Sequence, residues 1–257
     1  MIKLIRNLKP YKMAVLTLLV VLVVQAFGDI SIPSYMQKII DTGIQNKGVE
    51  HIMPSKIKGD EYREAQIFMN DGEKALWSSS YKKDGENYTL VVKDEKKLNK
   101  LDRTLLKPIV LSYQLGHMTV KQFKNTVKEQ LSARPETKAM AMRIDDMSIS
   151  EIANMMKVDI KSFKAKDQSG KLHTYVDMRP LIQSHIASGE MDESEINKSR
   201  SDMDKTISSV GDKTLRSMGI AYATSASQEA GVDIDGVQKT YLRHTAFKMM
   251  LVTFLMI

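Results

Sequence analysis

One apolar segment near the N-terminus constrains the fold of this chain more than any other feature. Between Met13 and Gln37 the sequence contains a single charged residue, Asp29. A helix rises about 1.5 Å per residue, so this segment is long enough to cross a hydrocarbon core of about 30 Å. We therefore predict a first transmembrane helix over residues 13–37, with Pro33 as a site where it bends.

Charge before the apolar segment predicts its orientation. Four basic residues precede it: Lys3, Arg6, Lys9 and Lys12. Positively charged flanks stay on the cytoplasmic side of a membrane. Residues 1–12 are therefore expected to form a cytoplasmic elbow, and the chain after Gln37 is expected to lie outside the cell.

A cleaved signal peptide is the alternative interpretation of the same segment. It has a basic start, an apolar middle and a permissible cleavage site at Val24-Gln25-Ala26. The apolar pattern continues past that site through Ile30, Ile32 and Met36, which favours a retained membrane helix.

A second apolar run lies at the other end of the sequence. Residues 246–257 are apolar except for Lys248, and the residues after Lys248 would extend only about 13 Å as a helix. That length does not cross a bilayer. We expect residues 244–257 to be the start of a second transmembrane helix, truncated at Ile257.

The region between the two apolar runs, residues 38–243, is predicted to be an extracellular inserted domain. Both of its ends must return to the same face of the membrane, so it should fold compactly. The fold class we predict is a membrane protein fragment in which transmembrane α-helices flank a mainly helical α+β extracellular domain.

Composition narrows the possible partners and chemistry. The 257-residue chain has a net charge of +7, but six basic residues beside the apolar runs supply most of this excess and the middle region is nearly neutral. This distribution favours a lipid bilayer over nucleic acid as the partner. The chain has no cysteine, which excludes disulfides, thiolate metal sites and a cysteine nucleophile.

Local patterns predict the secondary structure of the inserted domain. A β-hairpin is expected near 74–92, with Lys74–Tyr81 and Asn87–Val92 as strands around the turn signal Asp84-Gly85. From residue 98 onward the pattern is mostly helical. Helix caps are expected at Thr119 and at Ser148 or Ser150, a weaker hairpin should pair 159–163 with 172–176, and a long helix should cover about 192–231.

Several patterns in the sequence match a known functional motif only in part, and none of them predicts a functional site. Ser79 and Ser80 each precede a lysine by three positions, but the companion motifs of penicillin-recognising enzymes are missing. Asp233-Ile-Asp-Gly236 resembles part of a calcium loop, yet Gly231 and Leu242 stand where two of its ligands belong. Ser148–Phe163 resembles half of a helix-turn-helix, which the neutral charge disfavours.

The remaining patterns give no site either. The five histidines have no metal-ligand spacing, and the sequence has no P-loop. We predict no catalytic, cofactor-binding or metal-binding residue in this chain.

The residues at both ends resemble a known family. Leu8–Gln45 is similar to the opening of the membrane domain of an ATP-binding cassette exporter, with Lys9-Pro10-Tyr11 as the elbow and with Gln25, Asp29, Pro33, Ile40-Asp41 and Gly43-Ile44 near the end of the first span. Met218–Ile257 is similar to the return into the second span. The resemblance is to a subset of Gram-positive bacterial multidrug-type exporters that carry a large insertion between these two spans.

The resemblance implies a function for the longer protein. It would move a substrate across the plasma membrane with ATP and Mg, using a nucleotide-binding domain that this chain does not contain, and it would pair with a second identical or different exporter subunit. A different possibility is a single-span, membrane-anchored extracellular module that binds or senses a ligand.

Overall fold

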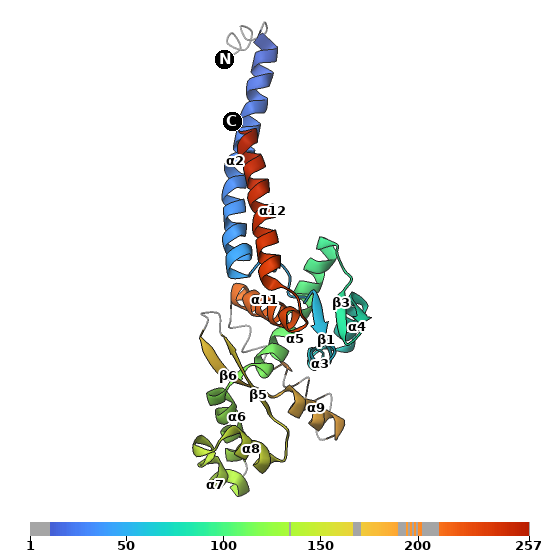
Figure 1. Cartoon of the computed structure of the whole chain (residues 1–257), viewed down its shortest axis with the longest axis vertical. Coiled ribbons are helices and arrows are strands. Elements are labelled where there is room, and N and C mark those ends of the chain that lie inside the picture. The colour runs from blue at the N-terminus through green and yellow to red at the C-terminus, as the bar shows by residue number, and fades with distance from the viewer. Residues whose placement is uncertain are drawn as a thin grey trace. The chain divides into compact units, whose positions relative to one another are not determined.

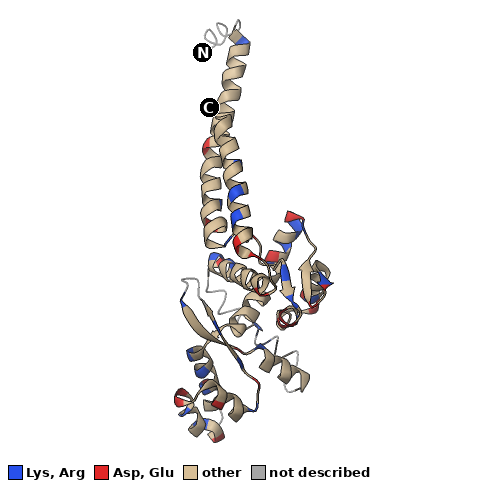
Figure 2. Cartoon of the chain, viewed as in Figure 1, with Lys and Arg blue, Asp and Glu red and all other residues tan. Residues whose placement is uncertain are grey.

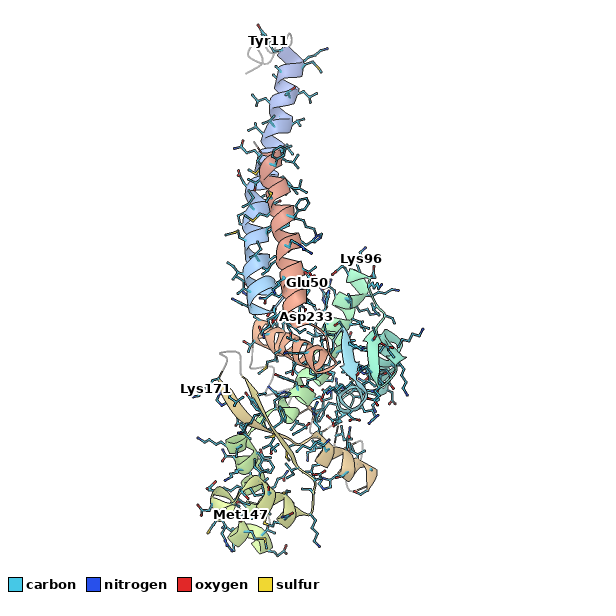
Figure 3. All side chains as sticks on the ribbon, viewed as in Figure 1. Tyr11, Glu50, Lys96, Met147, Lys171 and Asp233 are labelled. Atoms are coloured by element: carbon cyan, nitrogen blue, oxygen red, sulfur yellow. The ribbon has the colours of Figure 1, made fainter. Side chains whose placement is uncertain are left out.

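In the computed structural model the apolar N-terminal segment forms α2 (Lys12–Lys38), which continues as the π-helical segment η2 (Ile39–Gln45). Pro33 lies inside α2 and the helix continues beyond it. By length and composition, residues 12–45 are long and apolar enough to cross a membrane, a property that a signal sequence near the N-terminus shares. Most of the apolar side chains of α2 are exposed (Figure 3).

The structure describes residues 11–133, 135–166, 171–189, 194, 196, 198, 200, 201 and 211–256. The chain forms two compact units, one made of residues 1–50 and 233–257 and the other of residues 51–232. The second unit is therefore shorter at both ends than the predicted domain, 38–243. Among the described residues helices predominate and the strands form two small sheets, so the fold is mainly helical α+β (Figure 1).

The first unit is built on a pair of antiparallel helices, α2 and α12 (Ile234–Leu255), which lie side by side (Figure 1). Glycines in the first helical segment, residues 12–45, lie against side chains of the second, residues 234–256. A Cβ atom on Gly28 would lie 1.9 Å from Met256 Sδ, and one on Gly43 would lie 2.4 Å from Leu242 Cδ2. The two intervals, 28 to 43 and 242 to 256, are nearly equal in length, so the helices keep the same register throughout.

Charge is distributed unevenly over this helix pair. Figure 2 shows a long uncharged stretch in α2, whereas α12 carries basic residues in its first two thirds. Lys239, Arg243 and Lys248 are these basic residues, and only apolar residues and Thr253 follow them in α12. The polar and apolar parts of α12 are thus separated along its length.

The first sheet of the second unit contains β1 (Lys56–Lys58), β3 (Asn87–Leu90) and β2 (Tyr81–Asp84), in that order and all antiparallel. The hairpin at Asp84-Gly85 is present, and Gly85 has a positive φ of 63° as the turn requires. Its first strand is shorter than predicted, because most of 74–81 belongs to the helix α4 (Asp71–Ser80).

The prediction of a strand over 74–81 was therefore wrong for a local reason. Asn70 and Glu73 form a capping box that begins α4, with reciprocal hydrogen bonds of 2.9 Å between side chains and backbone amides. Trp77 of this helix is completely buried, and its ring lies against Tyr62 and Tyr81. The apolar residues that indicated a strand therefore belong to a helix, and Trp77 lies buried on its inner face.

The second sheet contains β4 (Met118–Thr119), β6 (Leu172–Asp177) and β5 (Lys161–Lys166), also antiparallel. The weaker hairpin that the sequence predicted is the β5–β6 pair, with Phe163 opposite Tyr175. The chain enters β5 after α8 (Ile149–Met156), so no second helix follows where a helix-turn-helix would need one.

Helices join and cover these sheets. Their bounds are α3 (Gly59–Glu64), α5 (Glu95–Gly116), α6 (Val120–Ser132), α7 (Lys138–Ala141), α9 (Arg179–Ala187) and α11 (Asp212–Glu229), with short 3-10 segments at Pro135–Thr137 and Ile144–Asp146. Thr119 caps α6 as predicted, and of the two serines considered Ser148 caps α8.

The predicted helix over 192–231 is not continuous. Gly211 has an extended conformation, with φ −60° and ψ 148°, and α11 begins after it. Residues 190–193 and 202–210 lie outside the described residues. Among the described residues of the second unit, one core contains Phe123, Val127, Ile144, Ile152 and Val176 beside the second sheet, and another contains Phe68, Val110, Leu111 and Leu215 around α5 and α11.

Candidate functional site

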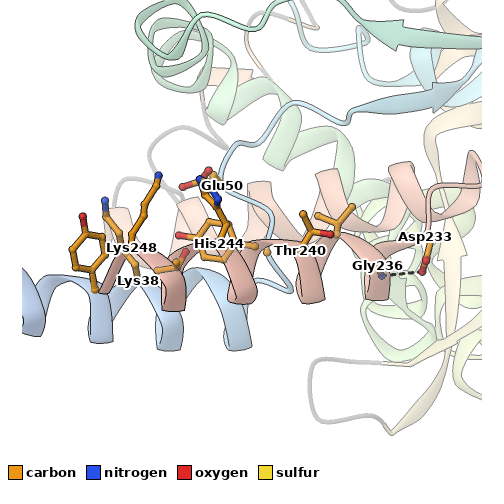
Figure 4. A pocket seen from close by; sticks show the side chains of 12 residues that line it. Lys38, Glu50, Asp233, Gly236, Thr240, His244 and Lys248 are labelled. Atoms are coloured by element: carbon orange, nitrogen blue, oxygen red, sulfur yellow. Dashed lines mark hydrogen bonds between the residues drawn. The ribbon is translucent and has the colours of Figure 1, made fainter. Parts of the chain in front are cut away.

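A pocket of about 680 Å³ lies within the first unit, between the end of α2 and the first two thirds of α12 (Figure 4). We call it the helix-pair pocket. Its ionisable and aromatic lining side chains, apart from the capping Asp233, are Tyr35, Lys38, Glu50, Tyr241, His244 and Lys248. Gly48 and Gly236 contribute backbone to its wall, which leaves room between the two helices.

Local sequence explains how these side chains converge. Tyr241, His244 and Lys248 follow each other at intervals of three and four residues, so they share one face of α12. Lys38 occupies the last turn of α2. Beyond η2 the chain reverses through Lys47 and Gly48, both with positive φ, which brings the following residues back toward α12.

Two hydrogen bonds fix the frame of the pocket. Gln238 Nε2 donates to the carbonyl oxygen of Gly43 over 2.8 Å, which ties α12 to η2. Asp233 accepts a 3.0 Å hydrogen bond from the amide of Gly236 and thereby caps α12 (Figure 4). The Asp-Ile-Asp-Gly pattern is therefore a helix cap at the edge of the pocket.

The charged groups of the helix-pair pocket are separated along it, with the two lysines toward one end and Asp233 at the other (Figure 4). These lysines are Lys38 and Lys248, and Glu50 lies beside His244 (Figure 4). The Lys38 ammonium is 6.0 Å from the centroid of the Tyr35 ring, at the limit of a cation–π contact. Ammonium groups donate hydrogen bonds and accept none, so this end of the pocket suits an oxyanion.

A second polar centre lies buried in the other unit. The guanidinium of Arg179, which is 4% exposed, contacts three carboxylates: Asp177 at 2.9 and 3.0 Å, Glu61 at 2.7 Å and Glu64 at 3.1 Å. We call these four residues the Arg179 cluster. Gly116 makes space for it, because a Cβ atom there would lie 2.6 Å from Arg179 Cζ.

Burial shifts the proton affinities around this cluster. Desolvation raises the pKa of Glu64 to about 7, more than the charge of Arg179 lowers it, and it also raises the pKa of Glu61. Burial by itself would lower the pKa of the Arg179 guanidinium. The hydrogen bonds to Asp177 and Glu61 have a larger effect and raise this pKa. Desolvation lowers the pKa of the neighbouring His117 to about 4, assisted by the charge of Arg179.

The Arg179 cluster is a structural element. It connects α3, the end of β6, the start of α9 and the C-terminal end of α5, so it joins the parts of the second unit that carry the two sheets. With three carboxylates around one cation it carries a net negative charge once Glu61 and Glu64 are ionised. Removal of the cation would leave that charge buried without compensation.

The motif-like patterns from the sequence do not form catalytic groups. Ser79 and Ser80 both donate hydrogen bonds to the carbonyl oxygen of Leu76, within their own helix, while Lys82 and Lys83 are exposed on β2. Among the described residues, no group of three or more His, Asp or Glu side chains could hold a metal ion.

The histidines have different surroundings. His51 Nδ1 lies 2.9 Å from the buried Asp102, His117 contacts the carbonyl oxygen of Tyr113, and His244 lines the helix-pair pocket.

No protein family, curated protein or solved structure matches this chain.

Proposed function

We propose that this chain is part of the membrane domain of an ATP-driven bacterial exporter. In this proposal α2 and α12 are its first two consecutive membrane helices, and residues 51–232 form an extracellular domain inserted between them. ATP would be hydrolysed by a nucleotide-binding domain outside this sequence.

The antiparallel α2–α12 pair is the observation that carries the proposal. Small residues let membrane helices approach closely, and Gly28 and Gly43 occupy such positions against α12. The helices also meet where the chain leaves and re-enters the first unit, because a Cβ atom on Gly48 would lie 2.9 Å from the Cα atom of Gln238. A domain inserted between two spans requires this closeness of its two attachment points.

Exposed apolar surface supports a lipid environment for both helices. In α2, the exposed fractions of Leu18 and Ile30 are 61% and 73%, and near the end of α12 those of Met250 and Phe254 are 67% and 76%. Apolar surface on this scale is unfavourable in water and is typical of membrane or protein contact.

The resemblance of Leu8–Gln45 and Met218–Ile257 to exporter segments supports the choice of transporter class. If the chain belongs to such an exporter, the complete reading frame that contains it encodes further membrane helices and a P-loop ATPase domain. A frame that encodes neither would exclude the exporter.

A single-span surface module is the second candidate. It is favoured by one observation: among the described residues, only the helix over residues 12–45 is long and apolar enough to cross a membrane. In such a module α12 would not enter the bilayer beside α2.

Disulfide formation between positions 28 and 256 distinguishes the two candidates. Gly28 lies about 24 Å along the helix from Lys12 and therefore within the membrane-spanning length of α2. The double variant Gly28→Cys, Met256→Cys is expected to cross-link in native membranes under mild oxidation, because a side chain at 28 reaches Met256. The measurement is the mobility shift of the cross-linked species on a non-reducing gel.

A matched control uses the adjacent position. Phe27 is 66% exposed and is rotated about 100° around α2 from Gly28, so Phe27→Cys, Met256→Cys should cross-link poorly. Equal cross-linking of the two pairs, or none in either, would contradict the helix hairpin.

A further inference from the structure

We propose that the helix-pair pocket binds the phosphate group of an anionic phospholipid, with Lys38 and Lys248 as its cationic ligands. This inference rests on the proposed membrane position of α2 and α12. It assigns a binding site to residues that neither the composition nor the family resemblance had marked.

The position of Lys38 along α2 matches the headgroup layer. A hydrocarbon core of about 30 Å corresponds to about 20 helical residues, so a span that begins after Lys12 reaches the opposite interface near Pro33. Lys38 follows about 8 Å later, within the layer that lipid phosphates occupy. Tyr35 lies between them, as expected for an aromatic side chain at a membrane interface.

Helix register places Lys248 in the same layer. Gly28 contacts Met256 and Gly43 contacts Leu242, so residue 248 of α12 lies at the level of the last turn of α2. Both lysines line the pocket toward one end, and the phenol of Tyr241 and the ring of His244 line it as well (Figure 4). The lining carries two ammonium groups and two carboxylates, Glu50 and Asp233, and Asp233 lies at the opposite end of the pocket from the lysines (Figure 4). The lysine end therefore presents the cationic hydrogen-bond donors that a phosphodiester requires.

The surface next to the pocket favours a lipid over a soluble phosphate compound. Leu251 and Leu255 continue the helix face of Lys248 toward the centre of the span, and they are 49% and 71% exposed. On α2, Phe27 lies three turns before Lys38 on a similar face and is 66% exposed. A headgroup in the pocket would therefore have apolar side chains beneath it for its acyl chains.

The test measures lipid binding to the full chain in detergent micelles by native mass spectrometry. The probes are phosphatidylglycerol, phosphatidylcholine and glycerol phosphate. We expect selective binding of phosphatidylglycerol, and a loss of roughly tenfold or more in the double variant Lys38→Gln, Lys248→Gln. The matched control, Lys239→Gln, Arg243→Gln, removes the same charge from α12 outside the pocket lining and should retain most of the binding.

Each other outcome overturns the assignment. An equal loss in both double variants would mean general attraction to basic helices rather than a site. Glycerol phosphate that binds as tightly as phosphatidylglycerol would identify a soluble ligand. The 28–256 cross-link is measured in the same preparation: a cross-link without lipid selectivity rejects the pocket alone, whereas a missing cross-link rejects the helix pair on which it depends.

Discussion

Replacement of Arg179 by Met is expected to lower the free energy of unfolding of the second unit by about 3–5 kcal/mol, because it leaves Asp177, Glu61 and Glu64 buried without their cation. Trp77 is the only tryptophan and is fully buried in this unit, so its fluorescence reports the transition in a denaturant titration of the purified chain. The defect should shrink at acidic pH, where Glu61 and Glu64, whose pKa values are raised by burial, take up protons.

A surface arginine provides the control for this prediction. Arg63 also pairs with a carboxylate, that of Asp60, but its side chain is 68% exposed. Exposed pairs contribute at most about 1 kcal/mol, so Arg63→Met should have a small effect. If Arg179→Met is no more harmful than Arg63→Met, or if its defect does not depend on pH, the Arg179 cluster is not a buried charge network.

The substitution Glu64→Gln is expected to change how stability depends on pH. Burial raises the pKa of Glu64 to about 7 from 4.5, so the folded protein binds its proton more tightly than the unfolded chain. This tighter proton binding contributes its full stabilisation to the folded state below pH 4.5, and the contribution is lost as the pH rises toward 7. Relative to the Gln variant, the wild type should lose about 1.4 kcal/mol per pH unit across this window, in total about 3 kcal/mol.

His117 supplies a test of the sign. Its pKa is lowered to about 4 from 6.5, so its contribution is present above pH 6.5 and is lost as pH falls toward 4. The wild type should therefore lose stability on acidification relative to His117→Gln. This trend is opposite to the one expected relative to Glu64→Gln. The measurement is a set of denaturant titrations between pH 4.5 and 8, and parallel curves for all three proteins would refute both assignments.

Short-range signals in the sequence predicted the parts of the fold that depend on a few neighbouring residues. The apolar segment over 13–37 lies within one long helix, the turn at Asp84-Gly85 joins two strands, and Thr119 caps a helix as expected. The capping box at Asn70 and Glu73 was a signal of the same kind that was overlooked, and it would have corrected the strand predicted there.

Long-range contacts explain what the sequence did not reveal. The Arg179 cluster joins residues 118 positions apart, Glu61 and Arg179, and no pattern in either segment identifies its partner. The helix-pair pocket likewise needs Lys38 beside Lys248, from opposite ends of the chain. Only the shared helix face of Tyr241, His244 and Lys248 was visible in the sequence, and without the register of α2 against α12 it indicated no site.

The central claim, that α12 enters the membrane beside α2 while residues 51–232 remain outside, is tested most directly by thiol accessibility at position 254. Phe254 is 76% exposed, so the protein itself does not shield it. The chain has no cysteine, so Phe254→Cys and Lys83→Cys each introduce a single reactive thiol. An impermeant maleimide should label position 83, an exposed residue of β2, in intact cells. Position 254 should remain unlabelled until the membrane is dissolved in denaturing detergent. Labelling of position 254 in intact cells as fast as position 83 would contradict the account.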